Sequence, residues 1–368
     1  MAGIPVSPDF TKKLPKVELH AHLTGSISVA TLHNVWLDRK SKDPAFSLED
    51  PTIALPAEKV SYDVFTFFPL FDNYIYALCS NIESIRYVTN QVLRDFEADG
   101  VRYLELRTTP RESIPNNVTR EGYVSTVLDC INAFDREKMS TYLILSVDRR
   151  NTPAQAMETV DLAIRFKDRG VVGVDLCGNP LKGDVSLFRE AFHKAKAAGL
   201  KITLHFAEVP ESSTQEELLT LLSYEPHRIG HVINVPDNIK EVIAKKGKNI
   251  GLELCLSCNV HAKLIPGSFG DHHFGYWKNT ECSISICVCH LCYFMLGHRL
   301  MCIVKTDDVG IFQSPISNEY LLIAQHFNLG RDDLIQLSQG AVDSIFSGHT
   351  EKDRMLRLLS EFRSEIDL

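Results

Sequence analysis

The stretch KVELHAH at residues 16–22 is short and largely apolar, and it ends on two histidines one residue apart. We predict that it is the first strand of a series, because similar β-branched, apolar runs recur along the chain. The other runs are VRYLELR (101–107), TYLILSV (141–147), VVGVDLC (171–177), KITLHFA (201–207), HRIGHV (227–232), NIGLELCL (249–256) and CIVKTDD (302–308).

Segments with helical spacing of apolar residues lie between most of these runs, for example at 186–199, 213–224 and 238–247. Alternating strands and helices predict a parallel sheet, and eight strand–helix units close a (β/α)8 TIM barrel. An open doubly wound sheet is the alternative. Residues 27–100 hold helix-like pieces and no convincing strand, so we expect extra helices after the first strand.

The 368 residues contain no repeat, low-complexity tract or clear linker, which favours a single domain over 1–368. One segment, at about 278–305, is atypical because it is apolar and holds five of the ten cysteines. Loops inserted on a barrel surface are usually polar. The segment is either a genuine insertion or the product of a faulty gene model, such as a translated intron, and we favour the faulty gene model.

The net charge of −8 and the absence of a Lys/Arg-rich block argue against a nucleic-acid partner. The first fifteen residues lack the apolar core of a signal peptide, and no uncharged run is long enough to span a bilayer. We therefore expect a cytoplasmic protein without a membrane partner, acting as a monomer. Its cysteines should be free thiols or metal ligands rather than disulfides.

Polar residues gather where the predicted strands end, which on a barrel is a single mouth. His20 and His22 point to one face of their strand, so both can approach one cation. His205 and Asp307 end two further strands. Three histidines, one carboxylate and a water describe a catalytic zinc site with one zinc ion. The plain alternative is that the histidines are ordinary residues of the core.

Two other zinc patterns are weaker. HTE (349–351) fits the HxE motif of the zinc deaminases that bind their metal with one histidine and two cysteines. Those deaminases also have a PCxxC motif further along the chain, and none follows here, so a His/Cys/Cys zinc site is excluded. CLSC (255–258) and CHLC (289–292) could form a four-cysteine structural site. The thirty residues between them exceed the usual spacing, and CLSC continues a buried-looking strand.

In this order, HAH (20–22), HFAE (205–208), RIGH (228–231) and TDD (306–308) resemble the adenosine/AMP deaminase family of metal-dependent (β/α)8 amidohydrolases. The resemblance extends to its adenosine deaminase-like branch, whose members act on N6-methyl-AMP. It rests on LPKVELHAHLTGSIS, YLELRTTPRE, VDRR, GVDLCGNP and HHFGYW, and it covers nearly the whole chain outside the atypical segment.

The resemblance implies a role for each matching residue. His20, His22, His205 and Asp307 would bind zinc, and Asp307 would also orient the attacking hydroxide. The other two catalytic residues would be His231 as base and electrostatic anchor, and Glu208 as the acid that protonates N1 of a purine. Glu208 could instead be a surface residue.

Further positions would contact the purine. Asp308 would accept a hydrogen bond from it, or could merely cap the following turn. Gly178 would let the base approach the backbone, and His22 would face the substrate as well as the metal. Asp175 could orient a metal ligand from behind.

The 5′ end of the substrate is indicated by Thr24 and by TTPR (108–111). Deaminases of the free nucleoside carry an acidic residue where this chain has Thr24, and a carboxylate there would repel a phosphate. The TTPR residues Thr108, Thr109, Pro110 and Arg111 offer two hydroxyls and a guanidinium to a monophosphate. Arg111 could otherwise pair with Glu112 or with another acid on the rim. Asp148 is placed on the ribose or phosphate side.

We therefore expect a zinc-dependent aminohydrolase that removes the N6 amine of N6-methyl-AMP, or of a related N6-substituted purine nucleoside monophosphate, to give IMP. The alternatives are an adenosine or AMP deaminase, and a catalytically silent nucleotide-binding homologue in which the atypical segment disturbs the strand before Asp307.

Overall fold

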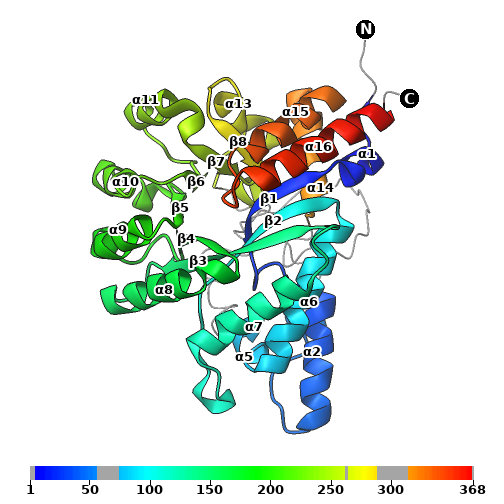
Figure 1. Ribbon diagram of the computed structural model, residues 1–368, viewed down its shortest axis with the longest axis vertical. Helices are drawn as coiled ribbons and strands as arrows, with labels where there is room; N and C mark the ends of the chain where they lie inside the picture. Colours follow the sequence, from blue (N-terminus) through cyan, green and yellow to red (C-terminus); the bar gives the residue numbers. More distant parts are fainter. Residues whose placement is uncertain (1–4, 56–73, 262–263, 288–313, 367–368) are drawn as a thin grey trace.

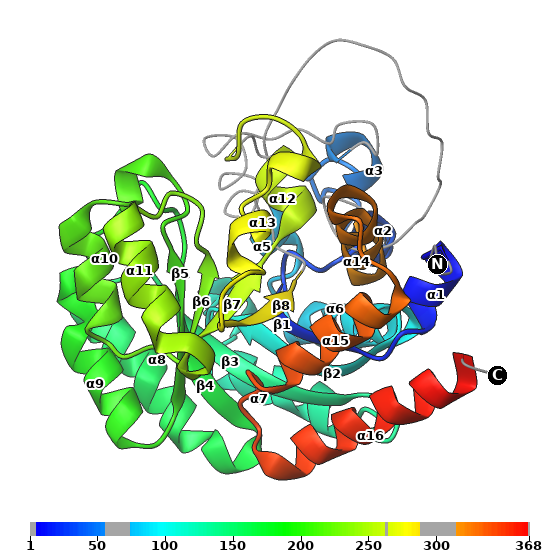
Figure 2. The ribbon, with the colours of Figure 1, turned by 90° about the horizontal axis from the view of Figure 1, so that it is seen from above.

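The structure is a computed structural model that describes residues 5–55, 74–261, 264–287 and 314–366. Eight strands form one parallel sheet whose order follows the chain. The strands are β1 (Lys16–His22), β2 (Val101–Thr108), β3 (Ser140–Asp148), β4 (Val171–Cys177), β5 (Lys201–Phe206), β6 (Arg228–His231), β7 (Gly251–Leu254) and β8 (Ser283–Ile286). The last strand returns beside the first, so the sheet is a nearly closed barrel (Figure 2). The predicted (β/α)8 barrel is confirmed.

Helices cover the outside of the barrel (Figure 1). Those after β2 are α7 (Arg120–Ala133), α8 (Pro153–Arg165), α9 (Arg189–Ala197), α10 (Gln215–Leu222), α11 (Asp237–Lys246), α12 (Leu256–His261), α13 (Phe274–Trp277), α14 (Ile316–Phe327), α15 (Arg331–Val342) and α16 (His349–Ile366). Short 3₁₀ turns precede some of them, such as η4 (Val185–Phe188) before α9 and η5 (Pro210–Ser212) before α10. None of the helices in the described part is long and apolar enough to cross a membrane.

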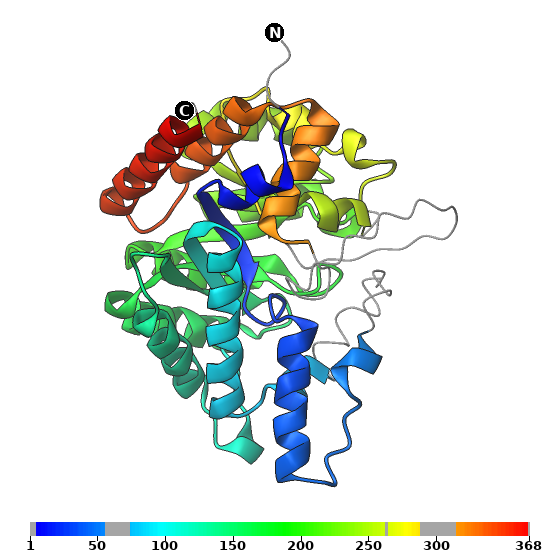
Figure 3. The same ribbon diagram turned by 90° about the vertical axis from the view of Figure 1, so that its right-hand side faces the viewer.

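The connection after β1 is helical, as predicted, and its described residues form no strand. It contains α2 (Val29–Lys42), α3 (Pro51–Ala54), α5 (Tyr76–Leu78) and α6 (Ile82–Ala98), while α1 (Pro8–Lys13) precedes β1. Figure 3 shows α2 and α6 side by side, extending away from the barrel. Asn81 begins α6 with a capping box, in which its side chain accepts from the backbone N–H of Ser84.

One prediction about the barrel is wrong in position. The strand that pairs with β7 is Ser283–Ile286, and its register runs from Gly251↔Ser283 to Leu254↔Ile286. The sequence predicts the eighth strand at 302–308, and those residues lie outside the described part of the chain. The barrel therefore takes its last strand from within the segment 278–305 that the sequence marked as atypical. The short apolar run SISI was hidden among the cysteines and apolar residues that follow it.

The strands are buried on both faces, and the two faces differ. In β1, Val17, Leu19 and Ala21 are fully buried and belong to the apolar core. The alternate positions Glu18 and His20 are equally buried. Burying each larger apolar side chain contributes about 1.5–3 kcal/mol. Further charged side chains without solvent exposure lie on β2, β4, β6 and β7, namely Glu105, Arg107, Asp175, Arg228 and Glu253.

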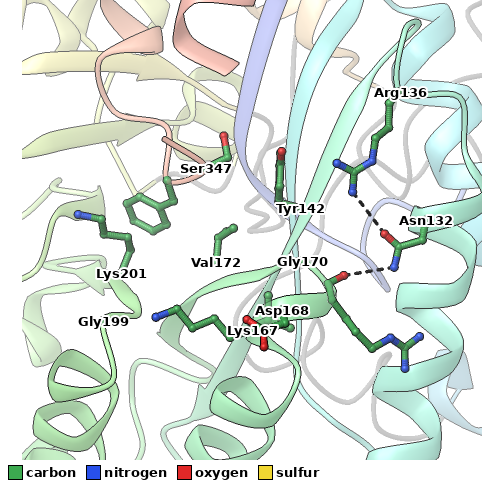
Figure 4. Close-up of a pocket in the computed structure, with 13 residues that line it drawn as sticks. Asn132, Arg136, Tyr142, Lys167, Asp168, Gly170, Val172, Gly199, Lys201 and Ser347 are labelled. Carbon is green, nitrogen blue, oxygen red and sulfur yellow. Dashed lines mark hydrogen bonds between the residues drawn. The ribbon is translucent and has the colours of Figure 1, made fainter. Parts of the chain in front are cut away.

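A hollow of about 530 Å³ lies where β3, β4 and β5 begin, at the end of the barrel opposite the predicted mouth. Figure 4 shows Tyr142, Val172 and Lys201 along it, with Ser347 from the loop before α16. None of the predicted site residues lines this hollow. The predicted site residues stand instead at the carboxyl ends of the strands, on the opposite side of the barrel.

Candidate active site

Three imidazoles meet at the carboxyl ends of β1 and β5. Nε2 of His205 lies 3.2 Å from Nε2 of His20 and 3.1 Å from Nε2 of His22. Imidazole nitrogens bound tetrahedrally to zinc at 2.0–2.1 Å stand about 3.3 Å apart. The three predicted histidine ligands are thus brought together at the spacing of a metal site, and the donor atoms of all three lie within 4.8 Å of one another.

Local sequence explains how close these rings come. His20 and His22 lie two residues apart on β1, so their side chains leave the same face. His205 reaches them across the barrel from β5. Gly230 of β6 makes room for His20, because a Cβ at position 230 would lie 2.7 Å from Cε1 of that ring. A larger residue at position 230 of the RIGH motif would therefore displace the His20 ring.

Each of two histidines is held by a carboxylate on its other ring nitrogen. Nδ1 of His20 lies 2.6 Å from Oε2 of Glu253, and Nδ1 of His205 lies 3.1 Å from Oδ1 of Asp175. Nδ1 of His205 is also 2.9 Å from the carbonyl oxygen of Leu176. These acceptors place the ring proton on Nδ1 and turn the Nε2 lone pair toward the shared centre. Lone pairs that face one another are stabilised by a cation, so the three residues fit a divalent metal ion.

Both orienting carboxylates remain charged. Burial alone would raise the pKa of Asp175, but His205 and Arg107 outweigh it and hold that pKa below its ordinary value. Burial also opposes ionisation of Glu253, and there Arg107 and Arg228 hold the pKa well below the usual range. Negative charge behind the imidazoles favours a cation in front of them.

Glu208 and His231 lie beside the cluster of His20, His22 and His205. The Glu208 side chain is buried, so the alternative that it is a surface residue is wrong. Its Oε1 is 3.8 Å from Nε2 of His231 and has no hydrogen-bond partner among the described residues. The His231 ring centroid is 5.1 Å from that of His20. A buried acid and an imidazole thus face the same space as the three predicted metal ligands.

The backbone turns sharply where these two residues stand. Ala207, His231 and Val232 have φ values of 52°, 66° and 49°, in the left-handed region that non-glycine residues rarely adopt. Such conformations cost about 1–3 kcal/mol each and occur where the surrounding structure enforces them, often at functional sites. The three left-handed residues stand where β5 and β6 end, and the turns they make direct Glu208 and His231 into the mouth of the barrel.

The motif HHFGYW supports His231 from behind. His273 donates through Nε2 to the backbone carbonyl of His231 at 2.6 Å. Asn259 lies between two rings, with Oδ1 3.5 Å from Nδ1 of His231 and Nδ2 3.1 Å from Nε2 of His272. Burial lowers the pKa of His273 to about 4 and holds that of His272 well below its ordinary value. Both supporting rings are therefore neutral near pH 7.

A second hollow, of about 740 Å³, lies beside the carboxyl ends of β2 and β3. Four of the predicted substrate-binding residues line it, namely Thr109, Pro110, Arg111 and Asp148. Thr109 connects it to the metal-site side, since its hydroxyl is 3.7 Å from the Cys177 sulfur. Cys177 lies with His22 and Asp175 in a group whose ligand atoms are within 4.8 Å of one another.

Arg111 is oriented by an aromatic ring. Its Cζ lies 3.0 Å from the ring centroid of Tyr76. Arg111 and Glu112 form no ion pair within the described structure, so the alternative of a rim salt bridge is not realised. Stacking on Tyr76 holds the guanidinium at the hollow without using its N–H groups, which leaves them available to an anion.

The remaining predicted positions are more varied. Thr108 is buried, and its hydroxyl is hydrogen-bonded to that of Tyr123 at 2.7 Å. Asp148 forms a two-pronged ion pair with Arg150, at 2.9 Å and 2.8 Å. Gly178 has φ +99°, and a Cβ there would lie 2.6 Å from Asp148. Thr24 follows β1 in a turn and is partly buried.

Asp307 and Asp308 lie outside the described residues, so neither the predicted carboxylate ligand nor the predicted purine acceptor is placed. The second half of the four-cysteine alternative, 289–292, also lies outside them, and that alternative stays open. The six cysteines whose thiols are described form no disulfide with one another, as expected.

Sequence reasoning missed Glu253 and Tyr76. Glu253 had a usable signal, because a charged residue in an otherwise apolar strand must find a partner inside the barrel. Tyr76 had none, since nothing in its helical stretch distinguishes an aromatic residue that faces a site from one that faces the core.

Comparison with known proteins places these features in context. The family model for adenosine deaminase matches residues 15–287. The N6-methyl-AMP deaminase of Danio rerio is 35% identical, with 97% of each chain covered. The crystal structure of Arabidopsis N6-mAMP deaminase is 33% identical with a TM-score of 0.82, covering 96% of this chain and 99% of that one. Arabidopsis ADAL complexed with IMP is 32% identical with a TM-score of 0.83, covering 97% and 99%.

Proposed function

Because this chain belongs to the adenosine deaminase family, we propose that it is a zinc-dependent hydrolase that converts N6-methyl-AMP to IMP and methylamine. The observation that carries the proposal is the meeting of three imidazoles, Glu208 and His231 at one barrel mouth. The near full-length similarity to N6-methyl-AMP deaminases supports the choice of substrate, as does the likeness to a relative crystallised with IMP.

The metal would be held by His20, His22 and His205. Nitrogen ligands at this spacing suit zinc, and a catalytic zinc site keeps one position open for water besides its protein ligands. Zinc there would supply an activated water for attack on C6 of the purine. We assign one zinc ion to each chain and keep Asp307 as the fourth protein ligand and a contributor to catalysis, as the family pattern implies.

Glu208 would act on the purine ring. A purine becomes electrophilic at C6 when a proton is delivered to N1, and that proton must come from an acid inside the site. Glu208 is buried, and its Oε1 has no hydrogen-bond partner among the described residues, which leaves it able to face a ring nitrogen. His231 would take the proton lost by the attacking water and hold it at Nε2, close to the leaving amine.

The phosphate would lie in the hollow beside β2. Arg111 offers unused N–H groups there, and Thr109 adds a hydroxyl. Arg150 also lines the hollow, although Asp148 already neutralises much of its charge. Position 24 carries a threonine rather than an acid, so it adds no carboxylate that would repel the phosphate. Gly178, His22 and Asp308 are assigned to the base, as the family pattern implies.

The test is a purified-protein assay on N6-methyl-AMP, AMP and adenosine in parallel, following the ultraviolet change to a hypoxanthine product. Zinc content is measured on the same sample. We expect turnover of the methylated monophosphate well above that of the other two. Equal or faster turnover of adenosine or AMP would replace the proposed substrate, and the absence of turnover from a zinc-loaded protein would reject the proposed reaction.

One observation favours a second candidate, a nucleotide-binding protein without catalytic activity. His22 and His231 each end their strand, and His205 stands one residue before the end of β5, whereas residues 287–306 separate the end of β8 from Asp307. If that separation prevents Asp307 from reaching the metal, nucleotide binding would remain and turnover would not. Binding of IMP without turnover of any of the three substrates would identify this case.

The proposal implies a small-molecule partner only. We assign the activity to a cytoplasmic monomer that binds neither nucleic acid nor membrane. The free cysteines of the described part fit a reducing compartment. Light scattering together with a gel-filtration profile of the zinc-loaded protein tests the monomeric state.

A further inference from the structure

A fully buried arginine lies behind two of the proposed metal ligands. Arg107 stands on β2, and its guanidinium has no solvent exposure. Nη1 is 3.3 Å from Oδ1 of Asp175, and Nη2 is 2.9 Å from Oε2 of Glu253. Nη2 also donates to the carbonyl oxygen of Leu19, the residue before His20.

The oxygens that Arg107 contacts are the same ones that hold the histidines. Oε2 of Glu253 accepts from His20, and Oδ1 of Asp175 accepts from His205. The other oxygens are fixed from different strands. Oε1 of Glu253 receives Arg228 at 2.6 Å and Thr203 at 2.8 Å, while Oδ2 of Asp175 receives Ser146 at 3.0 Å. Each carboxylate is thus clamped at both ends.

We propose that Arg107 is a positioning residue for the metal site, because it couples the two carboxylates that orient His20 and His205. The inference rests on the proposed role of these histidines as zinc ligands. A planar guanidinium can donate to two carboxylates at once and hold them in a fixed geometry. An ammonium group can also donate to both, but it lacks the rigid fork that would fix their relative position. The contact with Leu19 adds a third anchor, since it fixes the backbone that carries His20.

Arg228 provides a matched comparison within the same core. It is equally buried, and it bonds Glu253 through Nε and Glu105 through Nη2. It makes no ion pair with Asp175, so its loss should disturb His20 and leave His205 in place. A purely structural role for buried arginines would predict the same effect for both residues.

The first experiment measures zinc affinity by competition with a chromophoric chelator, in Arg107→Met, Arg107→Lys and Arg228→Met. We expect Arg107→Met to weaken zinc binding by roughly 10- to 100-fold, the usual range for a residue that supports a metal ligand. Arg228→Met should weaken it less, and Arg107→Lys should recover only part of the loss. Folded Arg107→Met protein with wild-type zinc affinity would overturn the proposal, as would full recovery in Arg107→Lys.

Removing a buried charge can prevent folding, so a second measurement uses the unaltered chain and the lysine variant. Long-range ¹H–¹⁵N spectra of histidine side chains report which ring nitrogen carries the proton. We expect Nδ1–H for His20 and His205 in the wild type, with both signals altered in Arg107→Lys. An Nε2–H form of either ring in the metal-free wild type would overturn the assignment, and so would a change confined to one ring in the variant.

These readouts separate the two proposals. A wild-type protein that binds zinc with the expected histidine signals but turns over no purine would contradict the proposed reaction and leave the role of Arg107 intact. Turnover of N6-methyl-AMP by the wild type, together with unaltered zinc binding in Arg107→Met, would support the proposed reaction and contradict the role of Arg107.

Discussion

Nε2 of His205 lies 3.2 Å from Nε2 of His20, although the two histidines are 185 positions apart in the chain. Each ring is turned by a carboxylate on its far side, Asp175 for one and Glu253 for the other. The barrel closes a metal-binding geometry that neither strand could form alone, and this geometry leads to specific expectations.

Loss of one ligand should abolish metal binding. We expect His205→Asn to lower zinc affinity by about 100-fold or more, because the two remaining imidazoles and Asp307 leave the metal without its third nitrogen ligand. Excess zinc should also stabilise the wild type against heat, by about 2.7 kcal/mol at a zinc concentration 100 times the dissociation constant, and this effect should vanish in the variant. The exposed His193 on α9 is the matched control, and His193→Asn should retain stoichiometric zinc. Zinc retention in both variants would exclude His205 as a ligand.

Glu208 should matter for the chemical step and not for the metal. Glu208→Gln keeps the shape of the side chain but cannot deliver an acidic proton, so kcat should fall by roughly 100- to 10,000-fold at unchanged zinc content. Glu211, three residues later in η5, is exposed and provides the control. Steady-state kinetics of Glu208→Gln and Glu211→Gln on N6-methyl-AMP check this. A kcat for Glu208→Gln within a few-fold of wild type would remove Glu208 from the mechanism.

Arg111 should select for the phosphate. A charge-assisted hydrogen bond contributes about 1.5–3 kcal/mol, so Arg111→Ala should raise KM for the monophosphate by roughly 10- to 100-fold while leaving KM for the nucleoside nearly unchanged. Arg120 lines the same hollow but is paired with Glu158 at 2.7 Å. Arg120→Ala should therefore have little effect on either KM. If the two variants behave alike, the phosphate lies elsewhere.

Two deletions distinguish the barrel from the atypical segment. Because Ser283–Ile286 is β8, removing 278–305 deletes a barrel strand, and we expect that protein not to fold. Removing only 288–305 joins Cys287 directly to Thr306 and brings Asp307 next to the end of β8. Catalytic geometry tolerates displacements of only about half an ångström, so this shorter deletion should raise zinc content and turnover together.

Circular dichroism, zinc analysis and the deaminase assay on both deletions check this. The interpretation of 288–305 as a faulty gene model predicts a folded and more active shorter protein. Unfolding of the shorter deletion would instead make these residues a genuine part of the molecule.

Acid should destabilise the fold through His227, a half-buried histidine that is neutral in the folded chain. Burial, with Lys201 and Arg228 nearby, lowers the pKa of His227 to about 4. The unfolded chain binds a proton at this residue near pH 6.5 and the folded chain does not, so stability falls as pH drops from about 6.5 to 4. Urea unfolding of the metal-free protein between pH 7 and 5 measures the slope.

His227→Asn is the comparison for this slope, since an asparagine oxygen can still accept from the backbone N–H of Ile202, as Nδ1 of His227 does at 3.2 Å. We expect the unfolding free energy of the variant to depend less steeply on pH, by the equivalent of up to one bound proton. An unchanged slope would mean that His227 is protonated equally in the folded and unfolded chains.

The sequence by itself determined the barrel and the residues at its mouth. Strand and helix periodicities repeat at the correct spacing, and parallel strands must end at a common face, so the histidines at 20, 22 and 205 could be grouped without coordinates. The same rule placed Glu208 and His231, because both stand where an apolar run ends.

Only the tertiary structure decided which run is the eighth strand and what lies behind the proposed metal ligands. Periodicity could not separate Ser283–Ile286 from the apolar residues that follow it, since both favour strands, and hydrogen bonding to β7 made the choice. The core of Arg107, Glu253 and Asp175 joins β2, β7 and β4, and no local pattern relates strands so far apart in the chain. Such contacts depend on how the sheet curls, because each charged side chain must find its partner across the barrel interior.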